Sequence, residues 1–203
     1  MLAADDRAVR EIKDALRLAE RAGNDMAPEF ARMALGVALA HRHTVTERDQ
    51  GLTVMAQVSD VFAERVHNLG DRPLVDVYLA REWAWRGDTD EAIPLVRSST
   101  ERLVREGQLL AWGIPATAVL VQTLIDRGGE SDVAEATAAI IRLAKAPAED
   151  RLFVRDIWLL RLHALLARVE GDDVTYRDYR DRYRKMANEL GFEGHMQWAE
   201  EMP

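Results

Sequence analysis

The chain has 203 residues, 48% of them hydrophobic, and a formal net charge of −8. This composition can bury a sizeable core and is unlike that of disordered chains. The absence of cysteine excludes disulfides, thiolate nucleophiles and sulfur-ligated zinc. The acidic balance disfavours a sequence-independent grip on phosphate backbones, so we expect no nucleic-acid partner.

No apolar run approaches the roughly 20 residues that a membrane-spanning helix needs, and residues 1–10 lack the basic-then-apolar order of a secretory signal. We therefore expect a cytoplasmic protein that makes no membrane contact. The first four residues lead directly into a charged helical pattern, which suggests that the chain is part of a longer protein.

Apolar residues recur three and four positions apart along the chain, the spacing that lines one face of a helix. The first predicted helix covers residues 6–22 and ends at Gly23. The second has Pro28 in its first turn and stops near residues 41–44. These two helices are expected to form a hairpin.

Thr46 is the expected N-cap of a third helix, which closes at residues 68–70, and Asp71 is the expected cap of a fourth. The turn residues at 68–71 are a soft boundary, but no segment is rich enough in Ser, Pro or Gly to be a linker. We expect one helical-repeat domain over residues 1–203.

Turn residues then recur about 42 positions apart, each separating two helical patterns: Gly87-Asp88, Gly128-Gly129 and Gly171-Asp172. A fixed spacing of this kind indicates a structural repeat. The predicted fold is all-α, a tetratricopeptide-like α-solenoid of about ten antiparallel helices.

Ser131 is the expected cap of a helix over residues 132–146. The next helix, within residues 150–170, is apolar nearly all round and should therefore lie between neighbouring helices. An amphipathic helix over 173–190 and a short last helix over 194–202 complete the prediction, the last one capping the stack.

The segment from Tyr78 to Ile93 resembles the middle of a tetratricopeptide repeat. Ala80 and Ala92 match the two small positions at which paired helices approach closely, and Gly87-Asp88 matches the turn. Partial copies of this pattern occur at Gly129 with Ala134 or Ala136, and at Ala164, Gly171-Asp172 and Tyr176.

From about Val54 onward the chain also resembles the C-terminal helical region of actinobacterial, including mycobacterial, multidomain signalling proteins. In those proteins an adenylate cyclase domain or a LuxR-type regulator is fused to a signal-transducing ATPase. The resemblance lies in packing motifs: Tyr78 to Ile93, residues 113–117 (GIPAT), 155–161 (RDIWLLR) and 191–195 (GFEGH). The chain has no Gly-Lys-Ser or Gly-Lys-Thr phosphate loop, so no catalytic residue is carried over.

The five histidines are expected to be structural. His41 and His43 flank a helix end and point to different sides, which disfavours a metal site. His163 lies in the most apolar helix and is expected to be a hydrogen-bonded core or groove histidine. His67 and His195, at helix ends, are expected at the surface.

Aromatic residues are also first assigned to packing. Tyr176, Tyr179 and Tyr183 alternate with arginines, but their spacing and the nearby aspartates indicate an ordinary amphipathic helix rather than a single-stranded nucleic-acid surface. Trp83 and Trp85 cannot share one helix face, so one of them is expected on the concave surface of the solenoid.

Because the repeat pattern comes without a reactive constellation, we expect no catalytic residue, no metal and no cofactor in this chain. The leading hypothesis is a sensing or protein-interaction module whose concave face binds a protein, a peptide or a small effector. The expected groove residues are Tyr78, Arg81, Trp85, Trp112, Gln122 and Arg161. The alternative is a structural scaffold that forms a homodimer and binds no ligand. An enzyme, the third hypothesis, would rest on His163 near carboxylates.

Overall fold

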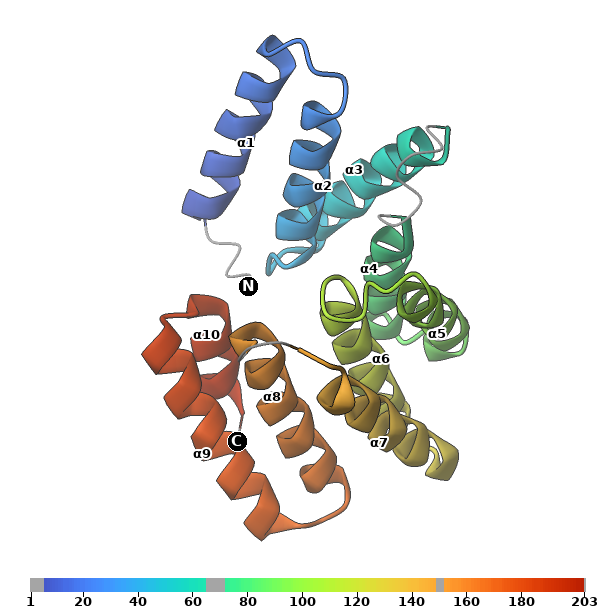
Figure 1. Ribbon diagram of the computed structural model, residues 1–203, viewed down its shortest axis with the longest axis vertical. Coiled ribbons are helices and arrows are strands. Elements are labelled where there is room, and N and C mark those ends of the chain that lie inside the picture. The colour runs from blue at the N-terminus through green and yellow to red at the C-terminus, as the bar shows by residue number, and fades with distance from the viewer. Residues whose placement is uncertain (1–5, 65–71, 149–151, 203) are drawn as a thin grey trace. The chain divides into compact units, whose positions relative to one another are not determined.

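The computed structural model describes residues 6–64, 72–148 and 152–202, which form ten α-helices and no strand (Figure 1). The helices are α1 (Asp6–Arg21), α2 (Ala27–Ala40), α3 (Val45–Glu64), α4 (Arg72–Trp85), α5 (Thr89–Arg105), α6 (Gly113–Arg127), α7 (Glu130–Lys145), α8 (Phe153–Val169), α9 (Asp173–Leu190) and α10 (Glu193–Glu201). The all-α class is confirmed, while the solenoid stays a prediction.

The chain divides into two compact units, Leu2–Leu79 and Ala80–Pro203, and the division falls within α4. The soft boundary predicted at residues 68–71, including the cap Asp71, lies outside the described residues. The single domain over residues 1–203 therefore stays a prediction. None of the helices in the described ranges is long and apolar enough to cross a membrane.

In the unit Leu2–Leu79, α2 packs against both α1 and α3. Two glycines make the α2–α3 contact close. A Cβ atom on Gly51 would lie 2.7 Å from the backbone nitrogen of Ala40 and 2.7 Å from the carbonyl oxygen of Gly36. Such a distance is too short for any side chain, so the two helices can approach this closely only at glycine.

The N-cap of α3 is Thr44, and the prediction of Thr46 is wrong. The Thr44 hydroxyl oxygen accepts a hydrogen bond from the Glu47 backbone N–H at 3.2 Å, and the hydroxyl donates to the Glu47 carboxylate at 2.6 Å. A threonine three residues before a glutamate satisfies an otherwise unpaired N–H of the first turn. Glu47 therefore selects the threonine three positions earlier.

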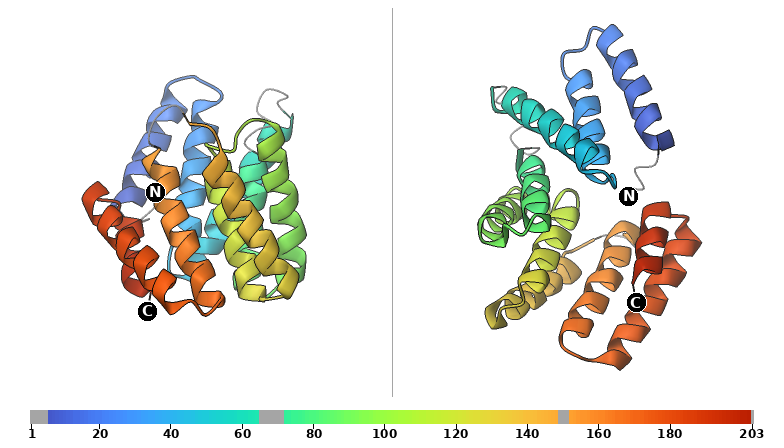
Figure 2. Two further views of the ribbon diagram at one scale, coloured as in Figure 1. Left: turned by 60° about the horizontal axis from the view of Figure 1, so that its bottom comes forward. Right: turned by 180° about the vertical axis from the view of Figure 1, so that it is seen from behind.

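In the unit Ala80–Pro203, helices that follow one another in sequence pack together from α5 through α10, and α6 also packs against α8. The predicted placement of the apolar helix is confirmed, because α8 contacts α6, α7 and α9. Figure 2 shows α8 and α9 as an antiparallel hairpin with α10 folded back beside it. The small residues Ala92, Ala136 and Ala164 are fully buried, as close helix pairs require.

The predicted glycine turns are present in the backbone. Gly87 and Gly171 have φ angles of 97° and 76°, a left-handed conformation that side chains other than glycine adopt at a cost. After Gly171, the Asp172 carboxylate accepts a hydrogen bond from the Thr175 N–H at 3.0 Å and caps α9.

The N-cap of α7 is Gly129, so the prediction of Ser131 is also wrong. The Asp132 carboxylate accepts a hydrogen bond from the Gly129 N–H at 3.0 Å. Arg127 holds that carboxylate from the preceding helix through two hydrogen bonds of 2.8 and 2.6 Å. The helix start is therefore set by an aspartate in its first turn instead of by a serine hydroxyl.

Candidate functional site

Two of the six expected groove residues are joined directly. The Arg161 Nη1 group of α8 donates a hydrogen bond to the Gln122 side-chain oxygen of α6 at 3.2 Å. Arg81 lies near enough for its positive charge to help lower the pKa of Arg161, an effect that burial of the guanidinium dominates. The structure thus brings Arg161 together with Gln122 and into electrostatic range of Arg81.

The other three expected groove residues differ in their degree of burial. Tyr78 is buried in the unit Leu2–Leu79, where its ring meets the edge of the His41 ring at 5.3 Å. Trp85 is 61% exposed at the end of α4, and Trp83 is also partly exposed. Trp112 is half-buried immediately before α6.

Arg161 belongs to a group of side chains that we call the aromatic cluster: Trp158, Arg161, Tyr183, His195 and Trp198. The Arg161 guanidinium lies over the rings of Trp158 and Trp198, at 5.7 and 5.0 Å from the ring centroids. Both distances are within the range of a cation–π attraction. Pairs spaced three residues apart on α8 and on α10 face one another here.

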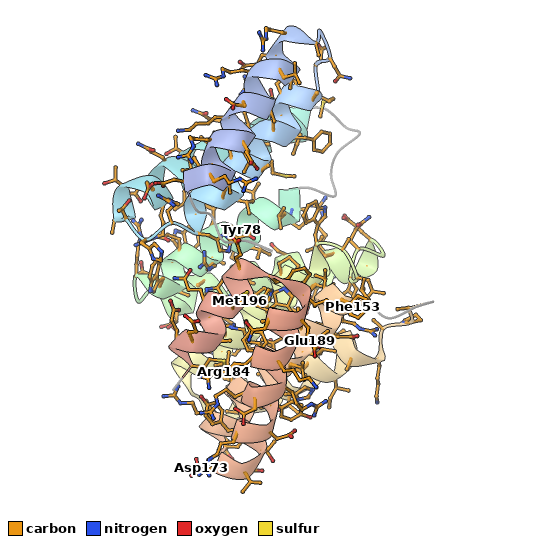
Figure 3. The ribbon with its side chains drawn as sticks, turned by 90° about the vertical axis from the view of Figure 1, so that its left-hand side faces the viewer. Tyr78, Phe153, Asp173, Arg184, Glu189 and Met196 are labelled. Carbon is orange, nitrogen blue, oxygen red and sulfur yellow. The ribbon has the colours of Figure 1, made fainter. Side chains whose placement is uncertain are left out.

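Helix α10 is held beside α9, as Figure 3 shows with Arg184 on α9 and Met196 on α10. Arg184 donates hydrogen bonds to the carbonyl oxygens of Ala199 at 3.0 Å and Met202 at 3.2 Å. These carbonyl groups at the end of α10 lack intrahelical partners, and a cation there also opposes the helix dipole. Arg184 therefore fixes the element that carries His195 and Trp198.

His195 is fully buried, which corrects the prediction of a surface residue. Its ring packs edge to face with the rings of Trp158 and Trp198, at centroid distances of 5.0 and 5.3 Å. Its Nδ1 atom lies 2.8 Å from the Tyr183 hydroxyl. The spacing of His195 and Trp198 placed both on one face of the last helix. The surface expectation instead rested on the place of His195 at a helix end, without a companion of nucleophilic or metal-binding type.

Three polar atoms of the aromatic cluster are buried without a hydrogen-bond partner among the described residues: Trp158 Nε1, Arg161 Nε and His195 Nε2. Folded proteins pair the large majority of their buried polar atoms. An unpaired one costs about 1–3 kcal/mol. The three exceptions gather within one cluster, so its composition is not explained by packing.

The charge states around these atoms follow from burial. Burial lowers the pKa of His195 to about 3, with Arg161 acting in the same direction, so the imidazole is neutral at neutral pH. Burial raises the pKa of Tyr183, so its phenol keeps its proton. We assign the protonated phenol as the donor to His195 Nδ1, its one described hydrogen-bond partner, and this assignment puts the imidazole proton on Nε2. With this tautomer, all three unpaired atoms are N–H donors.

His163 and His41 have local explanations. The His163 ring stacks on the Tyr179 ring, with the ring centroids 4.8 Å apart and an interplanar angle of 16°. Burial, together with the charge of Arg182, lowers the pKa of His163. His41 lies at the end of α2 with Nδ1 2.8 Å from the Val37 carbonyl oxygen. Within the described ranges no three His, Asp or Glu side chains gather as a metal site would require.

A second polar group joins α5, α6 and α7, and it differs from the aromatic cluster. Arg97 binds the Glu135 carboxylate through two hydrogen bonds of 2.7 and 2.8 Å, and Arg127 binds Asp132 in the same way. The hydrogen bonds from Arg127 are the main cause of the lowered pKa of Asp132. Each arginine of this second group is paired with a carboxylate, so the group is a structural connection between α5, α6 and α7.

The fold and the cluster define an all-α protein of packed helix hairpins with a buried, donor-rich aromatic cluster. Comparison of the chain with protein-family models, with curated proteins and with solved structures found no match.

Proposed function

We propose that this chain is a non-catalytic helical-repeat module that senses a ligand or binds a protein within a larger bacterial signalling or regulatory protein. The observation that supports it is the set of unpaired N–H donors on Trp158, Arg161 and His195. Natural sequences break the rule of paired buried polar groups mainly where function requires it. A group that supplies acceptors would remove the cost of these donors.

Binding suits this cluster better than catalysis does. A histidine with a pKa of about 3 is a poor general base at neutral pH. Arg161, in contrast, lies over two indole rings and is hydrogen-bonded to Gln122, so its guanidinium is held ready for recognition. The resemblance to helical regions of cyclase-linked and LuxR-type signalling proteins suggests the setting, a cytoplasmic protein in which ligand or partner binding is relayed to other domains.

A thermal-shift screen of nucleotides, sugars, organic acids and short peptides tests the proposal, because a ligand of the folded state raises its melting temperature. Three proteins are compared: the wild type, Arg161→Gln and the matched control Arg168→Gln. Arg168 lies two turns further along α8 and is exposed. We expect a ligand that stabilises the wild type and the control but not Arg161→Gln. Equal shifts for all three proteins with every compound would refute a binding role for the cluster.

A structural dimerisation scaffold is the second candidate, supported by two aliphatic side chains on helix surfaces. Val174 is 79% exposed and Leu18 is 64% exposed. Exposed apolar side chains stabilise a homodimer when its interface buries them. Light scattering after size-exclusion chromatography would then show a stable oligomer that the Leu18→Ser and Val174→Ser variants weaken. A monomer at all concentrations rules the scaffold out.

A further inference from the structure

We propose that the aromatic cluster binds the carboxylate group of a small organic monoanion, with the N–H groups of Trp158, Arg161 and His195 as the donors. This inference rests on the binding role proposed above and adds the chemical class of the ligand.

The hydrogen-bonding inventory of the cluster supports an oxyanion. Trp158 is 7% exposed and His195 is fully buried, yet each keeps one N–H without a partner among the described residues. Arg161 adds an N–H and a positive charge, since a guanidinium stays protonated in proteins. Three donors without an acceptor match the two oxygens of a carboxylate, which accept about four hydrogen bonds and donate none.

The orientation of Arg161 supports a planar carboxylate. Its Nη1 group is used by Gln122, and its Nε group is one of the unpaired donors. The edge formed by Nε and Nη2 is thus the one not used by Gln122. Arginine binds carboxylates side-on through two parallel N–H···O bonds, and the Nε–Nη2 edge provides this pair of donors.

The charges near Arg161 favour one negative charge over two. The charged groups close enough to act on its pKa include Arg81, which opposes its charge, and Asp126 and Glu201, which favour it. Two positive side chains face two carboxylates, so the neighbourhood is near neutral before any ligand binds. A carboxylate adds one charge opposite the guanidinium, whereas a phosphate dianion adds two beside Asp126 and Glu201.

Gln122 joins Arg161 to the protein surface. Gln122 is exposed, and its hydrogen bond to Arg161 is long, at 3.2 Å, with a neutral acceptor. A carboxylate on the Nε–Nη2 edge leaves this contact in place and adds charge-assisted hydrogen bonds, which are roughly twice as strong. Arg161 therefore contacts both an exposed amide on α6 and the indole rings of α8 and α10.

The experiment uses acetate and benzoate as carboxylates, acetamide and benzamide as neutral isosteres, and inorganic phosphate. Melting temperature and the indole ¹H–¹⁵N signals are measured for the wild type, Arg161→Gln and the control Arg168→Gln. The five tryptophans give five indole signals, and the Trp158→Phe variant identifies one of them.

We expect a carboxylate at about ten times its Kd to raise the melting temperature of the wild type and of Arg168→Gln by about 3–6 °C. The Trp158 indole signal should move downfield as its N–H gains an acceptor, and the amides should produce neither effect. Arg161→Gln should lose the response. Trp158→Phe removes one N–H and should weaken binding about 10-fold, which keeps the test valid if Arg161→Gln does not fold.

Three results overturn the inference: equal effects of amides and carboxylates, a response to phosphate alone, or an unchanged Trp158 signal with every probe. The last result means that the donors hold internal water only. If a neutral compound from the wider screen still acts through Arg161, the binding function stands and the carboxylate class is wrong. If no compound distinguishes Arg161→Gln from Arg168→Gln, both proposals fail.

Discussion

The two units of the chain differ in how their buried polar atoms are hydrogen-bonded. In Leu2–Leu79 the buried Arg48 side chain donates to the carbonyl oxygens of Arg42 and His43, and the α2–α3 contact is made by glycines. In Ala80–Pro203 the aromatic cluster encloses three N–H groups without acceptors among the described residues. The first unit is thus built for close helix packing.

This difference shows where the sequence departs from the arrangement of greatest stability. Helix α1 has no fully buried residue and covers α2 with a half-buried face, an arrangement that packing alone explains. The cluster on α8, α9 and α10 places two tryptophans, a tyrosine and a histidine around an arginine, at an energetic cost. Costs of this kind are typical of functional sites.

The largest effect is expected for Gly51→Ala, which tests whether the first unit depends on the glycine contact. A Cβ atom would meet two backbone atoms at 2.7 Å, and backbone cannot move aside as a flexible side chain can. We expect a loss of about 3 kcal/mol in the free energy of unfolding, measured by urea denaturation. Gln57→Ala, exposed on the same helix, should change it by less than about 0.5 kcal/mol.

The next effect concerns the buried imidazole of His195. Its folded pKa of about 3 lies below the unfolded value of about 6.5, so the unfolded chain takes up the proton first as the pH falls. Stability should therefore fall by about 2 kcal/mol between pH 6 and pH 4. His195→Phe should remove this part of the pH dependence in thermal unfolding. Identical pH profiles for wild type and variant would mean that the ring is not enclosed.

A smaller effect is expected for Asp132→Asn, which tests the paired network of the second unit. The carboxylate is buried while Arg127 is about one-third exposed, so the arginine charge left behind remains partly hydrated. We expect a loss of about 1–2 kcal/mol in chemical denaturation. Asp178→Asn, in an exposed ion pair with Arg182, serves as the control and should be nearly neutral.

The smallest effect is expected for Arg161→Met, although the arginine is central to the cluster. The change removes an unpaired buried N–H and keeps an unbranched side chain over the two indole rings, so gain and loss nearly cancel. We expect the unfolding free energy to change by less than about 1 kcal/mol while carboxylate binding is lost. A loss above about 2 kcal/mol would show that Arg161 supports the fold and that the cluster is structural.

Several local features followed from the sequence alone. The helix predicted over residues 173–190 has the bounds of α9, and the helix over 6–22 differs from α1 by one residue. Both are defined by apolar spacing and by a glycine turn, which are local properties. The predictions of Thr46 and Ser131 as N-caps were wrong. In both helices the N-cap depends on which acidic residue of the first turn pairs with the chain before it.

Only part of the candidate site could be predicted from the sequence. Gln122 and Arg161 were expected in a groove, and they are hydrogen-bonded although 39 positions apart. His195 was expected at the surface, because a histidine beside a glycine turn in a short last helix has no local reason to be buried. Its burial depends on Arg184 and on the contact between α9 and α10.

The sequence by itself determined the all-α class, the order of the helices and the glycine turns between them, because these depend on residues within about four positions of one another. Only the tertiary structure decided which polar atoms would be enclosed and left without partners. That outcome requires Trp158, Tyr183 and His195 to meet from three helices, and no spacing along the chain encodes the meeting.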